Sequence, residues 1–304
     1  MTEPFLEEIE ALRARASGLL CVNDAPPARL FHYTDAGGLI GLLSSRAVWA
    51  TDARFLNDST EVSLAREVVI NAASSVDVKT THARELVADL VRLEPWDLVR
   101  GNLYVASFST KRDLLSQWRA YGGDGLGYAI GVDTTIKLAP ASNPALPLPL
   151  VAHYSKVVYD RNAPGGVLWE TVVGMLQVLD HVDPASGTAR AGFVYQTILG
   201  LIRLIAPTLK NAGFAEEDEW RLIFENHSID VLEPVQFRPN GRGFSPYVSL
   251  RWDEPPVVEV VLGPRIPVAE GEHAVRLLLL ANEHSAGVGE LKAEVTRSTV
   301  SYRR

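Results

Sequence analysis

The segment EEDEWR at residues 216–221 gathers the side chains with the clearest chemical potential in the sequence. The alternating apolar residues that follow it predict a strand with Trp220 on its buried face. Glu217, Glu219 and Arg221 would then share the opposite face. Two carboxylates beside a guanidinium can hold a cationic or oxocarbenium-like centre and bind sugar hydroxyls. A solvated acidic strand entrance, in which Arg221 is an ion-pair partner, is the structural alternative.

A histidine stands early in the chain, in the segment FHYTD at residues 31–35. His32 falls near the end of a predicted strand at 29–33. Tyr33 and Thr34 follow it, and Thr34-Asp35 can cap the predicted helix that comes next. An imidazole at such a place can face a cleft and donate a hydrogen bond to a ligand hydroxyl. A packed histidine whose hydrogen bonds are satisfied inside the protein is the alternative.

The segment LYVASFS at residues 103–109 alternates and is rich in strand-forming residues. Side chains two apart in a strand share a face, so Ser107 and Ser109 would point together. Tyr104 would point to the opposite side unless a bulge intervenes. Two small hydroxyl groups on one face suit contacts to a ribose or an amide, and an edge strand with solvated serines is the alternative.

Aromatic residues and glycines follow in the segment WRAYGGDGLG at residues 118–127. Trp118 and Tyr121 are three apart on a predicted helix, so they could form one stacking surface. The GGDGLG run resembles neither a phosphate-binding loop nor a strand-preceded GxGxxG, which argues against nucleotide-phosphate binding there. A hydrophobic anchor followed by a tight turn is the alternative.

The turn LNDSTE at 56–61 is typical of a helix cap. It could also give an acidic rim to the cleft where the other candidate residues converge.

Charge and residue usage limit the partners of the chain. The 304 residues carry a net charge of -8, so the overall field repels phosphate backbones and disfavours nonspecific binding to nucleic acid. A single cysteine and seven histidines without HExxH or HxxxH spacing predict no disulfide and no metal site. The N-terminal segment has acids among its apolar residues, unlike a secretory signal, and no later segment reaches the about 20 apolar residues of a membrane span. We therefore expect a cytoplasmic protein without a metal or a membrane partner.

These side chains would be positioned by short alternating elements. Helical spacing predicts helices at 5–20, 37–43, 60–73, 82–93, 113–121, 167–182, 193–212 and 273–284. Strand-forming residues predict strands at 29–33, 48–50, 103–109, 128–132, 150–159, 217–225, 229–237, 247–250, 257–262 and 291–300. No internal repeat is visible in this succession.

Five segments then occur in a characteristic order: FHYTDAGGLIGLLSSRAVWAT, FLNDSTE, YVASFSTKRDLLSQWRAYGGDGLGYAIGVD, FAEEDEWRLIF and VVLGP. In this order they resemble the bacterial family known as domain of unknown function 2971 (DUF2971). The resemblance runs from about residue 30 to about residue 264. No stretch looks like a long flexible linker, and the proline-rich segment at 140–149 is the only candidate seam between domains. We interpret it as a surface loop, so we expect a single domain over residues 1–304, with a helical extension at 1–28, a core at 29–264 and a closing helix and strand at 265–304.

A more distant resemblance is to the ADP-ribosyltransferase fold. That fold has a histidine on an early strand, a tyrosine or serine on a middle strand and a glutamate at the start of a later strand. The order is matched here by His32, by Tyr104 with Ser107 and Ser109, and by Glu217 or Glu219. The resemblance implies an α+β fold with a mixed, mostly antiparallel split sheet and helices packed around it.

By this resemblance the protein would bind NAD as a substrate and transfer ADP-ribose to an unknown acceptor macromolecule, as a toxin or phage-defence effector would. His32 would bind a ribose hydroxyl, Tyr104 or Tyr121 would stack on nicotinamide, and Glu219 or Glu217 would stabilise the oxocarbenium ion. The other residues expected in the NAD site are Tyr33, Thr34, Ser107, Ser109, Trp118 and Arg221. A catalytically inactive nucleotide- or protein-binding module of the same fold is the alternative.

Overall fold

The computed structural model describes most of the chain. The described residues are 3–19, 25–56, 60–92, 102–139, 152–160, 166–181, 187–226, 235–240, 243–252, 254–286 and 293–302. The predicted acidic rim at 56–61 lies largely outside them, because 57–59 are not described. No helix within the described ranges is long and apolar enough to cross a membrane.

Contacts divide the chain into two compact units, each assembled from three separate stretches. The helical unit comprises Met1–Asp24, Leu56–Gly101 and Lys156–Phe214. The sheet unit comprises Ala25–Phe55, Asn102–Ser155 and Ala215–Arg304. Whether both units act as the single domain implied by the sequence stays a prediction.

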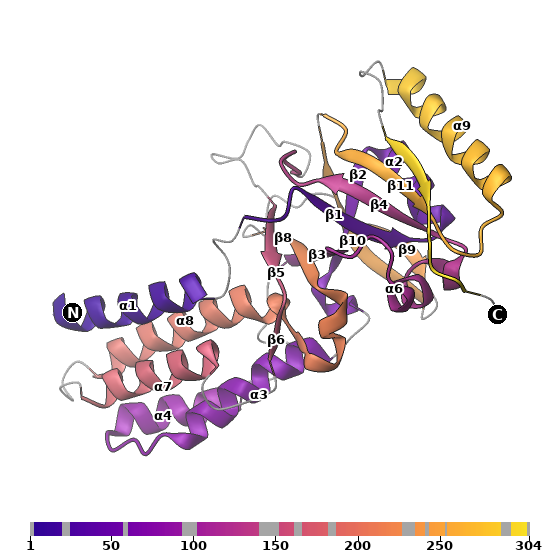
Figure 1. The fold of residues 1–304 in the computed structure, drawn as a ribbon. Helices are drawn as coiled ribbons and strands as arrows, with labels where there is room; N and C mark the ends of the chain where they lie inside the picture. The colour runs from indigo at the N-terminus through magenta and orange to yellow at the C-terminus, as the bar shows by residue number, and fades with distance from the viewer. Residues whose placement is uncertain are drawn as a thin grey trace. The chain divides into compact units, whose positions relative to one another are not determined.

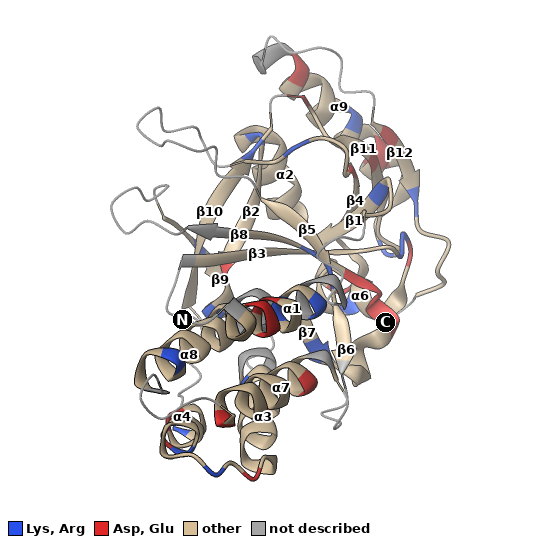
Figure 2. Cartoon of the chain, turned by 90° about the vertical axis from the view of Figure 1, so that its left-hand side faces the viewer, with Lys and Arg blue, Asp and Glu red and all other residues tan. Residues whose placement is uncertain are grey.

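The helical unit consists of helices that pack side by side (Figure 1). They are α1 (Glu3–Leu19), α3 (Thr60–Ser75), α4 (Thr81–Val91), α7 (Val167–Asp180) and α8 (Gly187–Ile205). A parallel pair of short strands, β6 (Val158–Asp160) and β7 (Leu209–Asn211), and a 3-10 turn, η4 (Ala206–Thr208), complete the unit. Acidic and basic residues lie on the exposed side of α1 (Figure 2), where Arg13 contacts Glu10. The helices are therefore amphipathic, with their apolar sides inside the unit.

The sheet unit carries a large, mostly antiparallel sheet. Its strands are β1 (Arg29–Thr34), β2 (Ala47–Asp52), β3 (Asn102–Ser109), β4 (Tyr128–Asp133), β5 (His153–Lys156), β8 (Glu219–Asn226), β9 (Gln236–Asn240), β10 (Gly243–Arg251), β11 (Val257–Leu262) and β12 (Glu294–Arg297). Its helices and 3-10 turns are α2 (Ala36–Ser45), α6 (Leu115–Ala120), α9 (Val268–Ala286), η1 (Ala53–Phe55), η2 (Gly123–Gly125) and η5 (Ala212–Glu217), the last of which begins in the helical unit.

The strand order is β12-β11-β4-β1-β3-β2-β10-β9, with β8 paired to β3 and β5 paired to β8. β11 pairs with β12 in parallel, whereas the remaining pairs along this order and the β3–β8 pair are antiparallel. This arrangement confirms the prediction of an α+β fold with a mixed, mostly antiparallel sheet.

Strand β3 is the point at which the sheet divides. One edge of β3 is covered by β8 along its whole length, Asn102 to Ser109. The other edge is shared: β1 pairs with it at Ser109, and β2 pairs with it at Val105 and Tyr104. We call the place between these two pairings the fork. Because a strand has only two edges, β1 and β2 must diverge from the fork as separate prongs.

The main core lies on the face of β3 and β8 that carries Trp220. Trp220, Leu222 and Phe224 alternate on β8 and are all buried, as the periodicity of two predicts. In the antiparallel register Trp220 lies opposite Phe108. Cross-strand partners share a face, so the side chains that alternate with these residues must point to the other side of the sheet.

Several element boundaries differ from those predicted. The strand expected at 150–159 is two strands, because β5 pairs with β8 while β6 pairs with β7 in the other unit. The helix expected at 113–121 is shorter, because the Asp113 carboxylate accepts hydrogen bonds from the Trp118 indole and from the Ser298 hydroxyl. The helix expected at 273–284 is longer and begins at Val268, directly after Pro267.

Candidate functional site

His32 lies at the fork, where neither prong pairs with β3. Its Nδ1 is 2.8 Å from the carbonyl oxygen of Ser107, which falls between the pairing at Ser109 and the pairing at Val105. A carbonyl can only accept, so Nδ1 carries the hydrogen, and Nε2 of the neutral ring is an acceptor. Burial lowers the pKa of His32, and the nearby positive charge of Arg238 lowers it further. The imidazole is therefore neutral at pH 7.

Ser107 and Ser109 share one face of β3, as predicted, but their environments differ. The side chain of Ser107 is exposed. The Ser109 hydroxyl is buried, donates to the carbonyl of Glu217 at 2.6 Å and accepts from the backbone N–H of Lys111 at 2.9 Å. Tyr104 lies on the opposite face, where its ring stacks on Phe224 at 6.2 Å between centroids. Of these three side chains, only that of Ser107 is open to a ligand.

Glu219 and Arg221 form a buried ion pair along β8. Nε of Arg221 donates to Oε1 of Glu219 at 2.8 Å, and both side chains are at most 4% exposed. In the register, Glu219 lies opposite Ser109 and Arg221 opposite Ser107, so all four share the face that lies away from the main core. The pairing favours the ionised carboxylate and also offsets much of its charge.

Glu217 does not lie on the strand, which corrects the predicted alternation. It ends the 3-10 turn η5, and β8 begins only at Glu219. The residue between them, Asp218, has a φ of 43°, a left-handed conformation that breaks the period of two. Its carboxylate accepts from the hydroxyl of Thr110, and its carbonyl accepts from the backbone N–H of Thr110 at 3.2 Å. The Glu217 side chain is nevertheless buried.

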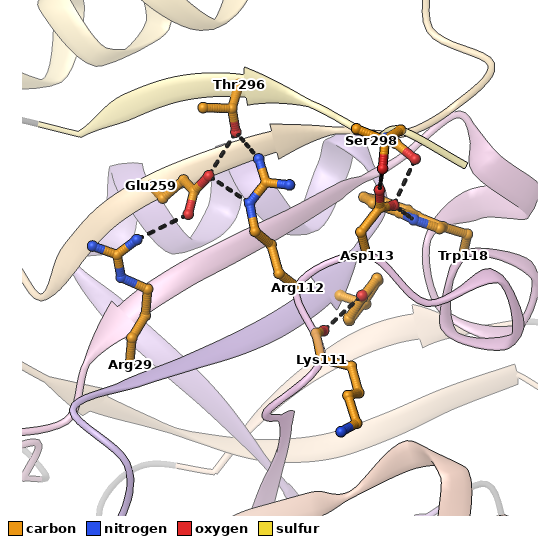
Figure 3. Close-up of polar contacts among 10 residues, drawn as sticks. Arg29, Lys111, Arg112, Asp113, Trp118, Glu259, Thr296 and Ser298 are labelled. Atoms are coloured by element: carbon orange, nitrogen blue, oxygen red, sulfur yellow. Dashed lines mark hydrogen bonds and ion pairs between the residues drawn. The ribbon is translucent and has the colours of Figure 1, made fainter. Parts of the chain in front are cut away.

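Tyr33 and Trp118 are parts of a second apolar cluster. The rings meet edge to face at 4.8 Å, and Trp118 is fully buried. The Trp118 indole donates to Asp113 at 2.7 Å (Figure 3), and the Tyr33 hydroxyl donates to the carbonyl of Lys111 at 2.8 Å. Burial raises the pKa of Tyr33. Trp118 is thus the hydrophobic anchor of the alternative interpretation, and Tyr121 packs partly buried against the same cluster.

Thr34 positions the start of α2. A Cβ added at Gly38 would lie 1.8 Å from Oγ1 of Thr34, so only glycine allows this close approach. Asp35 caps the helix by accepting from the backbone N–H of Gly38 at 2.7 Å, as its sequence position predicts. The segment from His32 to Asp35 therefore joins the fork to a fixed helix start.

Sequence reasoning missed a second group beside the fork. Arg238 of β9 is half-buried and donates from Nη2 to the hydroxyl of Thr51 at 2.8 Å. Its guanidinium carbon lies 6.0 Å from the centroid of the Trp49 ring, which in turn lies 4.9 Å from the ring of Tyr247. The signal was weak because Arg238 falls just beyond the strand predicted at 229–237, and its partner Thr51 is 187 residues away.

The candidate site therefore consists of two parts of the sheet unit. His32, Ser107, Thr51 and Arg238 gather around the fork, and Glu219 and Arg221 pair on the neighbouring strand. Whether His32 and the glutamates line one cavity stays a prediction. Within the part of the chain that the structure describes, no group of three or more histidine, cysteine, aspartate or glutamate side chains is arranged to hold a metal ion.

These features define an α+β protein with a forked, mostly antiparallel sheet. A family model described as protein of unknown function (DUF2971) matches residues 117–222, from α6 to the first half of β8. The match confirms the resemblance to the DUF2971 family, and it includes Glu217, Glu219 and Arg221. No curated protein and no solved structure matches the chain.

Proposed function

We propose that the sheet unit is an ADP-ribosyltransferase-like module that binds NAD and transfers ADP-ribose to an acceptor macromolecule. Its biological setting would be that of a toxin or a phage-defence effector. The observation that supports this proposal is His32 at the fork, with Nδ1 bound to the Ser107 carbonyl at 2.8 Å. A split sheet with a histidine on an early strand is the pattern from which the proposal comes.

His32 would act as a binding residue rather than as an acid. Its neutral ring offers Nε2 as an acceptor, and a ribose hydroxyl is a donor of matching size. Since Nδ1 is fixed by a backbone carbonyl, the ring needs no reorientation when the ligand arrives. The exposed hydroxyl of Ser107 on the adjacent strand would supply a further contact to the ribose.

Glu219 would stabilise the positive charge that develops on the ribose. In the transfer, the bond between ribose C1′ and the nicotinamide nitrogen breaks, and its electron pair leaves with nicotinamide. The acceptor nucleophile forms a new bond to C1′ and releases its proton to the solvent. A carboxylate near C1′ lowers the barrier because it is already oriented toward the cationic centre. Arg221 would keep that carboxylate ionised.

The same ion pair favours a second candidate function. Because Arg221 offsets the charge of Glu219 at 2.8 Å, the carboxylate would stabilise an oxocarbenium ion less than an unpaired one. A catalytically inactive module that binds a nucleotide or a protein would need no free carboxylate. The two candidates share the ligand site and differ only in turnover.

The test measures NAD binding and NAD cleavage separately. The full chain is titrated with NAD by calorimetry, and it is incubated with NAD labelled in the adenylate part together with cell extract. Transfer predicts saturable binding, release of nicotinamide and label on a macromolecule. Binding without release or labelling would favour the inactive module. No binding of NAD at millimolar concentration would overturn both candidates as far as NAD is concerned.

A further inference from the structure

Among the described residues, no carboxylate pairs with the half-buried Arg238, unlike three other arginines of the sheet unit that are also at least half-buried. These three make ion pairs at 2.7 to 2.8 Å: Arg221 with Glu219, Arg112 with Glu259, and Arg265 with Asp124. Among the described residues, the hydrogen-bond partner of Arg238 is the neutral hydroxyl of Thr51. Within the described part of the chain, this half-buried guanidinium thus lacks the carboxylate partner that Arg112, Arg221 and Arg265 have.

Burial of this charge calls for an anion. Loss of water lowers the pKa of Arg238, although guanidinium remains protonated at any physiological pH. A charge removed from water is costly unless an opposite charge compensates it. Asp35 contributes some negative potential, but its side chain is exposed and already accepts from the backbone N–H of Gly38. The counter-charge of Arg238 is therefore incomplete without a ligand.

The neighbours of Arg238 fix its orientation. In the register, Tyr247 of β10 lies opposite Gln236 of β9 and opposite Thr51 of β2, so Arg238 reaches across β10 to the prong that carries Thr51. The Trp49 ring lies beneath the guanidinium at 6.0 Å. The guanidinium is thus held by one hydrogen bond to Thr51 and by the Trp49 ring on one of its faces. Its remaining N–H groups can donate two hydrogen bonds to one ligand.

We propose that Arg238, together with the hydroxyl of Thr51, binds a phosphate or pyrophosphate group of a nucleotide. Phosphate oxygens match the planar fork of a guanidinium, which can donate two parallel hydrogen bonds to them. His32 lies near enough for the charge of Arg238 to affect it electrostatically, and it adds no competing charge while neutral.

If the phosphate group belongs to NAD, this inference rests on the proposed function, because NAD carries a pyrophosphate group. The anion site itself does not depend on NAD being the ligand. Inorganic phosphate, pyrophosphate, ADP and any other phosphorylated nucleotide offer the same chemistry to Arg238. The experiment must therefore distinguish the anion site from the NAD site.

The full chain is titrated by calorimetry with inorganic phosphate, pyrophosphate, ADP and NAD in turn. Arg238→Gln removes the charge, and Arg238→Lys keeps the charge but loses the two-point contact. Arg251→Gln is the matched control, because Arg251 is an exposed arginine at the end of the neighbouring strand β10. We expect pyrophosphate and ADP affinity to fall about 10 to 100-fold in Arg238→Gln, several-fold in Arg238→Lys and not at all in Arg251→Gln.

The outcomes separate this inference from the proposed function. Binding of pyrophosphate and ADP that depends on Arg238, without binding of NAD, would support the anion site and contradict the NAD proposal. Pyrophosphate and ADP binding that is equal in wild type and Arg238→Gln would contradict the anion site, and saturable binding of NAD by both would leave the NAD proposal standing. Failure of wild type to bind any of the four probes would overturn the anion site. If Arg238→Gln does not fold, as judged by circular dichroism, Arg238→Lys decides: unchanged pyrophosphate affinity in it overturns the two-point contact.

Discussion

At the scale of single residues, charge and folding are coupled most tightly in the pair of Glu219 and Arg221. Both groups are buried, so a substitution that removes one charge leaves the other charge buried without a partner. Any loss of activity in a variant of this pair must therefore be separated from a loss of folded protein.

Glu219→Gln should reduce both stability and nicotinamide release, by different amounts. Breaking a buried ion pair costs about 3 kcal/mol of unfolding free energy, and loss of an oriented charge lowers the rate about 100 to 1000-fold. Glu217→Gln should match this rate effect only if Glu217 is the working carboxylate. The measurement is a urea melt and nicotinamide release at saturating NAD, with exposed Glu216→Gln as the control. Normal turnover in both buried variants would exclude a role for either carboxylate.

His32 gives the fork a pH dependence of known sign. Its pKa in the folded state lies below the value of 6.5, mainly because of burial. The unfolded state therefore binds more protons, and the free energy of unfolding falls as the pH decreases below about 6.5. The groups that face the ring are the Ser107 carbonyl and the charge of Arg238. We expect His32→Asn, whose amide can still donate to that carbonyl, to show a shallower fall between pH 7 and 5 in urea melts; an equal slope would contradict the assignment.

At the scale of elements, β8 separates its two faces by chemistry. Trp220→Ala removes a buried indole from the main core and should cost ~3 to 5 kcal/mol of unfolding free energy. Ser107→Ala on the exposed side of β3 should change the same quantity by less than about 0.5 kcal/mol. Denaturant melts of both variants check the assignment of faces. Similar midpoints for the two variants would contradict this assignment of faces.

The C-terminal strand β12 is held by a buried carboxylate. Glu259 accepts from Arg112 and Thr296 at 2.8 and 2.7 Å and pairs with Arg29 at 3.1 Å (Figure 3). Burial alone would raise the pKa of Glu259, but the Thr296 and Arg112 hydrogen bonds and the two arginine charges hold it below its usual value of 4.5. The stabilisation is therefore present above about pH 4.5 and is lost as the pH falls below it.

Glu259→Gln should accelerate hydrogen exchange in β12 at pH 7 and flatten the loss of stability between pH 4.5 and 3. The exchange of the Ser298 amide, which donates to the carbonyl of Leu262 at 2.8 Å, reports on the strand directly. Glu294→Gln, at an exposed position of β12, is the matched control. Equal exchange in the two variants would show that Glu259 does not hold the strand.

Local patterns and distant pairings differ in how well the sequence reveals them. The buried Trp220 and the cap at Asp35 follow from neighbouring residues alone, so they could be predicted. Glu217 could not be placed, because the left-handed backbone at Asp218 leaves no signature in alternation. Arg238 could not be found either, since its environment is made by Thr51, 187 residues away. The fork itself is a property of pairing and has no motif.

At the scale of the whole molecule, the negative charge limits its encounters. A net charge of -8 repels the phosphate backbone of nucleic acid at long range, whereas a single basic group such as Arg238 attracts phosphate only at short range. We expect no binding of a random duplex of about 30 base pairs at about 150 mM salt, measured by fluorescence anisotropy. Tight, salt-dependent binding would contradict the expectation and would direct attention to nucleic acid as the acceptor.

The fork also governs the order in which the sheet unit can fold. β1, β2 and β8 all pair with β3, so residues 102–109 serve as a common template that is made after both prongs in the chain. The hydrogen bond between His32 and Ser107 already closes a loop of 75 residues. Both prongs can therefore pair with β3 only after residues 102–109 have been made, and such distant contacts form slowly. During synthesis, β1 and β2 would emerge long before β3 exists. Their edges would remain open to other partners until β3 is made.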